Sequence, residues 1–227
     1  MGELDIFIQR LAILLLPALF AITVHEAAHG WMAGKLGDNT AKMLGRITLN
    51  PIKHIDPVGT IAVPLVTYFI LGFPFGWAKP VPVNGRNLKN PMRDMAIVAL
   101  AGPGANLLMA IAWGLVVLLG VWIMPSSEWI GLPLTLMAAS GVVFNCILMV
   151  LNLTPILPLD GGRVVAGFLP PRQALIYSRL EPYGLFILVG LLATGILGKL
   201  LWPIVMVVIA LLPGSDVVLE LFQHLMR

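Results

Sequence analysis

The sequence predicts an all-α polytopic membrane protein with about five to six hydrophobic segments, broken helices and short interfacial extended segments. Of the 227 residues, 59% are hydrophobic and only 11% are charged, about half the charge content of an ordinary soluble domain. A spanning helix takes about 20 residues, so this hydrophobic content limits the chain to about six spans. No separate soluble domain fits beside them, and we expect a single intramembrane domain over residues 1–227.

Six apolar runs are long enough to form helices, at about 6–34, 58–76, 95–124, 133–157, 183–198 and 201–221. The last two predict a C-terminal helical hairpin at about 183–221. The 23 Gly and 18 Pro predict broken helices around an internal polar chamber, because non-helical backbone persists at membrane depth only where protein or water satisfies it. The run 58–76 contains Pro64 and Pro74, and we expect it to re-enter the membrane or lie shallow.

Two stretches resist helix formation and are expected near the cytoplasmic boundary of the membrane. Residues 43–49 alternate polar and apolar side chains and end before Asn50-Pro51. Residues 79–84 carry two prolines, which suit only an edge strand or an extended segment. Each stretch is therefore predicted to be extended.

Positive charge is concentrated in three clusters. They are Lys35, Lys42, Arg46 and Lys53, then Lys79, Arg86, Lys89 and Arg93, then Arg163, Arg172 and Arg179. Such clusters favour the cytoplasmic side, whereas the stretch between the third and fourth runs carries only Glu128 and is expected outside. This pattern places the N-terminus outside. The formal net charge of +3 lies in these short stretches, so we expect the lipid bilayer, and not nucleic acid, as a partner.

The first apolar run contains the HExxH motif His25-Glu26-Ala27-Ala28-His29. Residues four apart share one face of a helix, so both imidazoles can bind one metal ion while Glu26 acts as a general base on water. Ionisable residues are costly inside an apolar membrane helix and indicate a functional site there. The alternative is that these side chains only join helices through hydrogen bonds.

A catalytic zinc ion takes three protein ligands and leaves a fourth position open, so two histidines need one more donor. Asp160 is the best candidate. Pro155 and Pro158 break the fourth run before it, and Gly161-Gly162 let the backbone turn so that the carboxylate can point inward. The alternative is an aspartate that caps a turn at a helix end.

Three motifs in this order resemble those of the site-2 protease family, zinc metalloproteases that cut peptide bonds within membranes. They are HEAAHG at 25–30, AGPGAN at 101–106 and NLTPILPLDGGR at 152–163. In addition, NPIKHIDPVGT at 50–60 and GWAKPVPVN at 76–84 resemble a compact bacterial and archaeal branch without a PDZ domain. The resemblance implies a catalytic core at about 5–163.

The resemblance implies an intramembrane zinc metalloprotease that cleaves within or near transmembrane segments. It assigns one zinc ion per chain to His25, His29 and Asp160, and catalysis to Glu26. The branch suggests a single-span membrane protein as substrate. Together with the basic clusters, it predicts a multi-pass protein of the cell membrane whose active site lies toward the cytoplasmic side.

Two asparagines have a role only through the resemblance. Asn152 matches an asparagine that helps to hold substrate or the developing oxyanion, and Asn106 matches the asparagine of the Gly-Pro motif. From the residues alone, each amide can equally satisfy the backbone of another helix. The stretches 43–49 and 79–84 are either ordinary loops or an edge onto which an unwound substrate pairs as a strand.

Two further functions compete with proteolysis. A transporter or ion-coupled carrier can use the same His, Glu and Asp cluster as a cation or proton path, although we find no inverted repeat with a matching second site. A catalytically silent membrane adaptor is disfavoured because all residues of a zinc protease are present. Finally, His54 and Asp56 form either a second site or structural hydrogen bonds.

Overall fold

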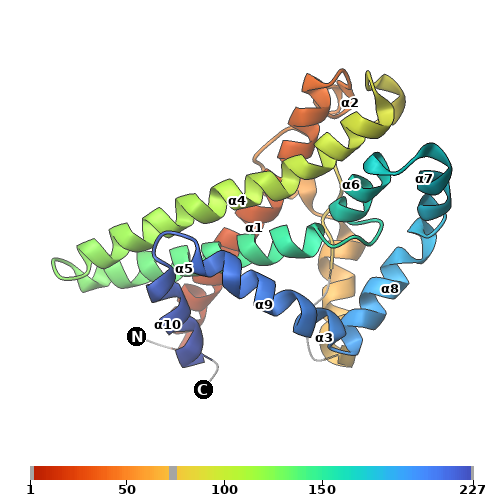
Figure 1. Cartoon of the computed structure of the whole chain (residues 1–227). Coiled ribbons are helices and arrows are strands. Elements are labelled where there is room, and N and C mark those ends of the chain that lie inside the picture. Colours follow the sequence, from red (N-terminus) through yellow and green to blue (C-terminus); the bar gives the residue numbers. More distant parts are fainter. Residues whose placement is uncertain (1–2, 72–75, 226–227) are drawn as a thin grey trace. The chain divides into compact units, whose positions relative to one another are not determined.

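The computed structural model describes residues 3–71 and 76–225. Residues 72–75, which include Pro74 and part of the predicted run 58–76, lie outside the described residues. The described residues form helices, turns and irregular segments, with no strand among them. This confirms the predicted all-α class (Figure 1).

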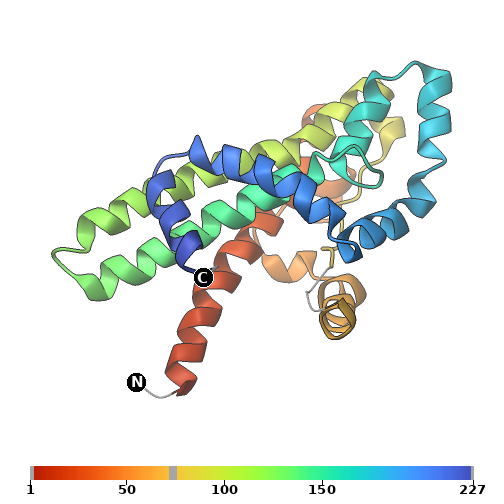
Figure 2. The same ribbon diagram turned by 60° about the horizontal axis from the view of Figure 1, so that its bottom comes forward.

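Three helices are long and apolar enough to cross a membrane. They are α1 (Glu3–Lys35), through its part Leu11–Lys35, α4 (Pro91–Ile123) and α5 (Glu128–Asn152). These helices match the predicted runs 6–34, 95–124 and 133–157. A short turn joins α4 to α5, and beyond it the two helices run side by side in both views (Figures 1 and 2).

The number of spans is somewhat lower than predicted. In the described part of the chain, α7 (Pro171–Ser178) and α8 (Glu181–Ala193) can supply a fourth span only as a pair bent by 59°. The stretch Pro57–Ile70, which combines a π-helix with α3 (Val63–Leu71), and α9 (Ile196–Ala210) are shorter apolar helices. Each falls short of the about 20 residues that a span requires.

The C-terminal region differs from the predicted two-helix hairpin at about 183–221. It forms three helices, because the run 201–221 is divided between α9 and α10 (Ser215–Leu225). Residues 211–214 separate them, and Gly214, directly before α10, adopts a φ of +70° in the left-handed region that glycine tolerates. Pro213 and Gly214 thus divide the predicted C-terminal run into two shorter helices.

The chain divides into two compact units, and each is described by itself. The first comprises Met1–Ala21, Gly104–Leu151 and Lys199–Arg227. Its described residues have a hydrophobic core that includes Val117 on α4, Val142 on α5 and Ile209 on α9. The second comprises Ile22–Pro103 and Asn152–Gly198, and it holds the HExxH motif together with Asp160. A single domain over 1–227 stays a prediction.

Short elements fill the rest of the second unit. They are α2 (Thr40–Met43), the 3-10 helices Pro51–His54 and Gly85–Asn87, the π-helix Pro57–Ala62 and α6 (Asp160–Phe168). The stretches 43–49 and 79–84 are non-helical beyond Met43, as predicted, but neither is a strand. Prolines at 80 and 82 have no N–H to pair in a ladder, and neighbouring N–H groups of this segment bond to side chains and loops instead.

Candidate metal centre

Three buried side chains converge at one point of the second unit. His25 and His29 lie one turn apart on α1, and Asp160 is the first residue of α6. The two imidazole Nε2 atoms are 3.1 Å apart. Asp160 Oδ2 lies 3.2 Å from Nε2 of His25 and 3.3 Å from Nε2 of His29. The three donor atoms therefore form a nearly equilateral triangle.

This triangle fits a zinc ion. Four donors at about 2.0–2.1 Å around a tetrahedral zinc are separated from one another by about 3.3 Å, close to the three spacings found here. Asp160 Oδ2 is buried and accepts no hydrogen bond within the described residues. A bound cation would satisfy this buried carboxylate oxygen. Two imidazoles and a carboxylate are also a donor set that zinc commonly takes in catalytic sites.

The orientation of His29 is fixed by α4. Its Nδ1 lies 2.8 Å from the carbonyl oxygen of Val98, so this nitrogen donates a proton and leaves Nε2 free to face the other donors. A hydrogen bond of this kind sets the tautomer and the ring angle of a metal-binding histidine. Val98 lies a turn before Pro103, the proline inside α4.

Gly102 lets α4 approach both imidazoles. A Cβ placed on this glycine would lie 2.6 Å from Cε1 of His25 and of His29 and closer still to Nε2 of His29. Such distances do not occur between real atoms. The position therefore requires glycine, because the backbone of α4 forms one wall of the metal centre.

Asp160 is placed by close packing around the start of α6. A Cβ on Gly161 would lie 2.5 Å from the carbonyl oxygen of Thr154, and one on Gly162 would lie 2.6 Å from the backbone nitrogen of Leu157. Neither glycine has a positive φ. The predicted turn thus depends on the small size of the two glycines, and not on a left-handed backbone.

Glu26 is half-buried next to His25 in the HExxH motif and accepts a main-chain hydrogen bond. The N–H of Val81 donates to its Oε2 at 2.9 Å. Gly30 makes room for this contact, because a Cβ there would lie 2.9 Å from Cγ1 of Val81. The segment 79–84 therefore lies directly over the HExxH turn of α1.

The contacts of 79–84 bear on the predicted strand pairing. Besides Val81, Lys79 donates its N–H to His54 O and Asn84 donates its N–H to Asp38. Pro80 and Pro82 have no N–H. Within the described residues, Val83 is thus the one residue of this segment whose main-chain N–H has no protein acceptor. Pairing with a substrate strand stays a prediction.

The two predicted asparagines occupy different surroundings. Asn106 belongs to the first unit, is fully buried, and donates through Nδ2 to Asn145 Oδ1 at 2.9 Å and to Ala21 O at 3.4 Å. This is the helix-joining role that the residues alone allow. Asn152 is half-buried at the end of α5, in the second unit with Asp160.

His54 and Asp56 have structural roles. The Nε2 of His54 lies 3.0 Å from Thr48 O. Asp56 caps the π-helix by accepting hydrogen bonds from the N–H groups of Val58 and Gly59. Within the described residues, the group of three possible metal-binding side chains is His25, His29 and Asp160, so a second metal site at His54 is not supported.

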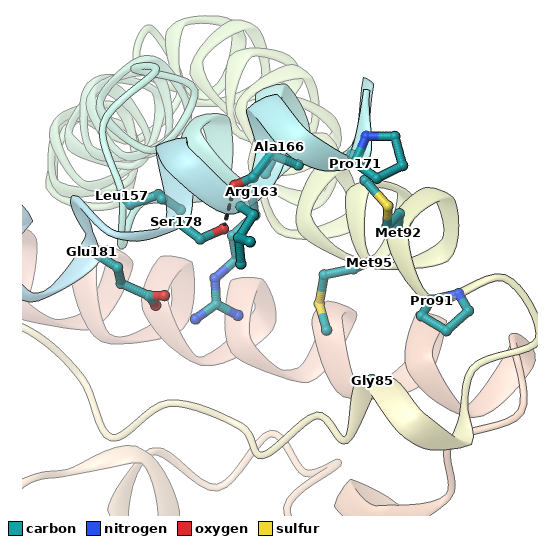
Figure 3. A pocket seen from close by; sticks show the side chains of 13 residues that line it. Gly85, Pro91, Met92, Met95, Leu157, Arg163, Ala166, Pro171, Ser178 and Glu181 are labelled. Atoms are coloured by element: carbon teal, nitrogen blue, oxygen red, sulfur yellow. Dashed lines mark hydrogen bonds between the residues drawn. The ribbon is translucent and has the colours of Figure 1, made fainter. Parts of the chain in front are cut away.

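A cavity of about 480 Å³ lies elsewhere in the second unit, lined in part by residues of α6. Arg163 and Glu181 project into it, and Met92 and Met95 form part of its wall (Figure 3). None of the three converging donors lines this cavity. It is therefore separate from the metal centre.

Sequence reasoning missed the contributions made by backbone groups. The Val98 carbonyl and the Val81 N–H carry no side-chain signal, and the wall that Gly102 forms beside the imidazoles was not predicted. A glycine directly before a proline in a long apolar helix was the one available hint, since it marks a place where another group can approach the backbone.

Curated relatives match most of the chain. It is 37% identical over 215 residues to the protein named "putative zinc metalloprotease YwhC" of Bacillus subtilis, with 94% of this chain and 92% of that protein covered. The chain belongs to the site-2 protease family. A relative named "putative zinc metalloprotease Rip2" from Mycolicibacterium smegmatis is 31% identical over 82% of this chain and 69% of its own length.

The Rip2 of Mycobacterium tuberculosis strain H37Rv is 27% identical over 77% of this chain and 64% of its own length. No protein-family model matches the chain, and neither does any solved structure. The names of these relatives support a zinc metalloprotease. Zinc is thus the metal that the converging His25, His29 and Asp160 are expected to hold.

Proposed function

We propose that this site-2 protease family member is an intramembrane metalloprotease of the cell membrane. It hydrolyses peptide bonds within or near the transmembrane segments of single-span membrane proteins. The observation that carries the proposal is the three-donor triangle with Glu26 beside it. Two of its donors and Glu26 lie on α1, a helix apolar and long enough to cross a membrane, and the third is Asp160 on α6. Ionisable groups are costly at such a position, so their presence there indicates a functional site.

His25, His29 and Asp160 would hold one zinc ion per chain. A zinc ion bound there makes water acidic enough to attack at neutral pH and polarises a carbonyl group. His29 contributes a fixed ring, since its hydrogen bond to Val98 O prevents rotation. Gly102 excludes other side chains from the wall beside both rings.

Glu26 acts as the general base and then as the general acid. Its carboxylate takes a proton from the attacking water and passes it to the nitrogen of the departing amine, which closes the proton balance of the hydrolysis. The Val81 N–H holds one carboxylate oxygen at 2.9 Å, which leaves the other to face the reacting water. Asn152 is assigned to binding the substrate or its developing oxyanion.

The proposed orientation rests on charge. The basic clusters over 35–53, 79–93 and 163–179 favour the cytoplasmic side for these segments. The turn between α4 and α5 carries Glu128 and faces outward. The active site then lies toward the cytoplasmic half of the membrane, ten residues of helix before Lys35, and the N-terminus lies outside.

The test is cleavage by purified protein reconstituted in lipid vesicles. The probes are single-span helices with a central Asn-Gly pair, which weakens their helical hydrogen bonding. Glu26→Gln should keep its zinc and lose at least about 100-fold in cleavage rate. Glu128→Gln, a matched change outside the site, should cleave normally. Normal turnover by Glu26→Gln would refute the mechanism.

The same vesicles distinguish the carrier alternative. A carrier must release its ion, so vesicles loaded with a zinc-sensitive dye would report zinc entry without peptide cleavage. A hydrolase should give cleavage products and no flux. Sealed vesicles that accumulate zinc and leave every probe intact would favour the carrier.

A further inference from the structure

Asp38 is a fully buried aspartate outside the metal centre. It follows α1 after a turn at Gly37, whose φ of +116° lies in the left-handed region that favours glycine. A Cβ on Gly37 would lie 2.9 Å from the carbonyl oxygen of Asn87. The end of α1 and the segment around Asn87 therefore pack backbone against backbone.

The Asp38 carboxylate joins these two parts of the chain. Its Oδ2 accepts from the N–H of Asn84 at 2.7 Å, and its Oδ1 accepts from Nδ2 of Asn87 at 2.8 Å. Oδ1 also accepts from the N–H and the hydroxyl of Thr40 within its own turn. We call Asp38, Asn84 and Asn87 the Asp38 clamp.

Every partner of the carboxylate is a donor, so the group is held in its charged form. Burial works to raise the pKa of Asp38, but the hydrogen bonds, with those from Thr40 first, outweigh burial and hold this pKa below its ordinary value. An amide of the same shape would turn an N–H toward one of these donors. The site is therefore specific for a carboxylate.

The clamp is coupled to Glu26 through a stiff piece of chain. Asn84 is three residues after Val81, whose N–H holds Glu26. Pro82 fixes its own φ and restricts Val81 before it. On the other side, the Arg46 guanidinium donates to Lys79 O at 2.8 Å. Val81 thus lies between two anchors, and Asp38 in the second of them is fully buried.

We infer that Asp38 is a positioning residue of the proteolytic site, which fixes the segment 81–87 so that the Val81 N–H orients the Glu26 carboxylate. Asp38 itself contacts none of the converging donors. The effect of Asp38 on catalysis rests on the proposed function. The Asp38 clamp itself, and its fixing of the segment 81–87, do not depend on that function.

The test compares Asp38→Asn with Thr40→Ala in the full-length protein. Asp38→Asn keeps the volume but places a donor against a donor. Thr40→Ala removes the bond that its hydroxyl donates to Asp38 and the 3.3 Å contact that the hydroxyl accepts from Asn87 Nδ2, but it leaves both bonds from Asn84 and Asn87 to position 38 in place. Two measurements are made on each: hydrogen exchange of backbone amides over 79–87, and cleavage of the Asn-Gly probe helix with zinc content determined in parallel.

Asp38→Asn should exchange faster over 79–87 and lose at least about tenfold in kcat. Its KM should stay within about twofold of wild type and its zinc content should not change, because the converging donors are untouched. Thr40→Ala should resemble wild type. Adding Asn87→Asp to Asp38→Asn should recover most of the kcat, because the new amide can donate to the new carboxylate while its oxygen accepts from Asn84.

Wild-type exchange over 79–87 or a wild-type kcat in Asp38→Asn would overturn the inference. So would a loss of kcat that follows the loss of zinc and is not recovered by Asn87→Asp. If Asp38→Asn does not fold, Asn87→Ala removes one of the two bridging contacts at a less buried position, and unchanged exchange there overturns the clamp. Absence of cleavage by the wild-type protein would instead overturn the proposed function, and the exchange result would still decide the clamp.

Discussion

Replacing Gly102 by alanine should damage the metal centre without altering any donor. The added Cβ would lie 2.6 Å from Cε1 of both His25 and His29, whereas ordinary contacts begin at 3.4 Å. The nearest approach, to Nε2 of His29, is closer still, so either the rings or α4 must move by about 1 Å. Metal–donor distances tolerate only about 0.2 Å, so the histidines cannot absorb this shift and still bind zinc in the same way.

Moving α4 instead does not rescue the site. A retreat of the helix by the same amount would stretch the bond between His29 Nδ1 and Val98 O, now 2.8 Å, to beyond hydrogen-bonding range. Loss of such a supporting bond lowers metal affinity by about 10–100-fold. Both ways of relieving the contact therefore predict weaker zinc binding in Gly102→Ala.

The assay is zinc affinity by competition with a chelator, on protein in detergent. Gly104→Ala is the matched control, because a Cβ at Gly104 meets nothing within 4 Å. It should bind zinc as wild type does. A folded Gly102→Ala protein with wild-type zinc affinity would show that α4 does not form a wall of the site, and the reasoning from backbone contact would be wrong.

Three further predictions concern metal, packing and acid. His29→Ala and Asp160→Ala should each lose zinc. A chelator should lower the thermal stability of wild type but not of these variants. Variants with the zinc content of wild type would refute the ligand assignment. Asn106→Ala should lower the free energy of unfolding by about 1–3 kcal/mol and keep zinc, whereas loss of zinc would give this asparagine a part in the site. The folded-state pKa of Asp38 lies below its ordinary value of 3.8. The charged carboxylate therefore contributes to the free energy of unfolding above that pH, and this contribution is lost as the pH falls through the folded-state pKa. The difference in thermal stability between wild type and Asp38→Asn should therefore become smaller in acid. A difference in unfolding temperature that does not change with pH would contradict this prediction.

The sequence was sufficient for the parts of the site that depend on side-chain chemistry. The HExxH spacing fixes His25 and His29 on one face of α1, so their convergence needed only a helix. Asp160 could be chosen because prolines and glycines around it break the helix, although the glycines act through their size. The long apolar runs in the sequence also predicted α1, α4 and α5, because the length of a hydrophobic run determines whether it can form a spanning helix.

The parts that could not be predicted depend on where backbone groups meet across long sequence separations. Val81 lies 55 residues from Glu26, and Val98 lies 69 residues from His29. Their N–H and carbonyl groups are common to every residue, so no residue type marks them. Asp38 was unmarked for another reason: a lone aspartate after a helix is ordinary, and only its four donors, two of them 46 and 49 residues away, distinguish it. A carboxylate that is satisfied by distant donors and has no metal to bind indicates a part of the chain whose position matters, and here that part is the segment that holds Glu26.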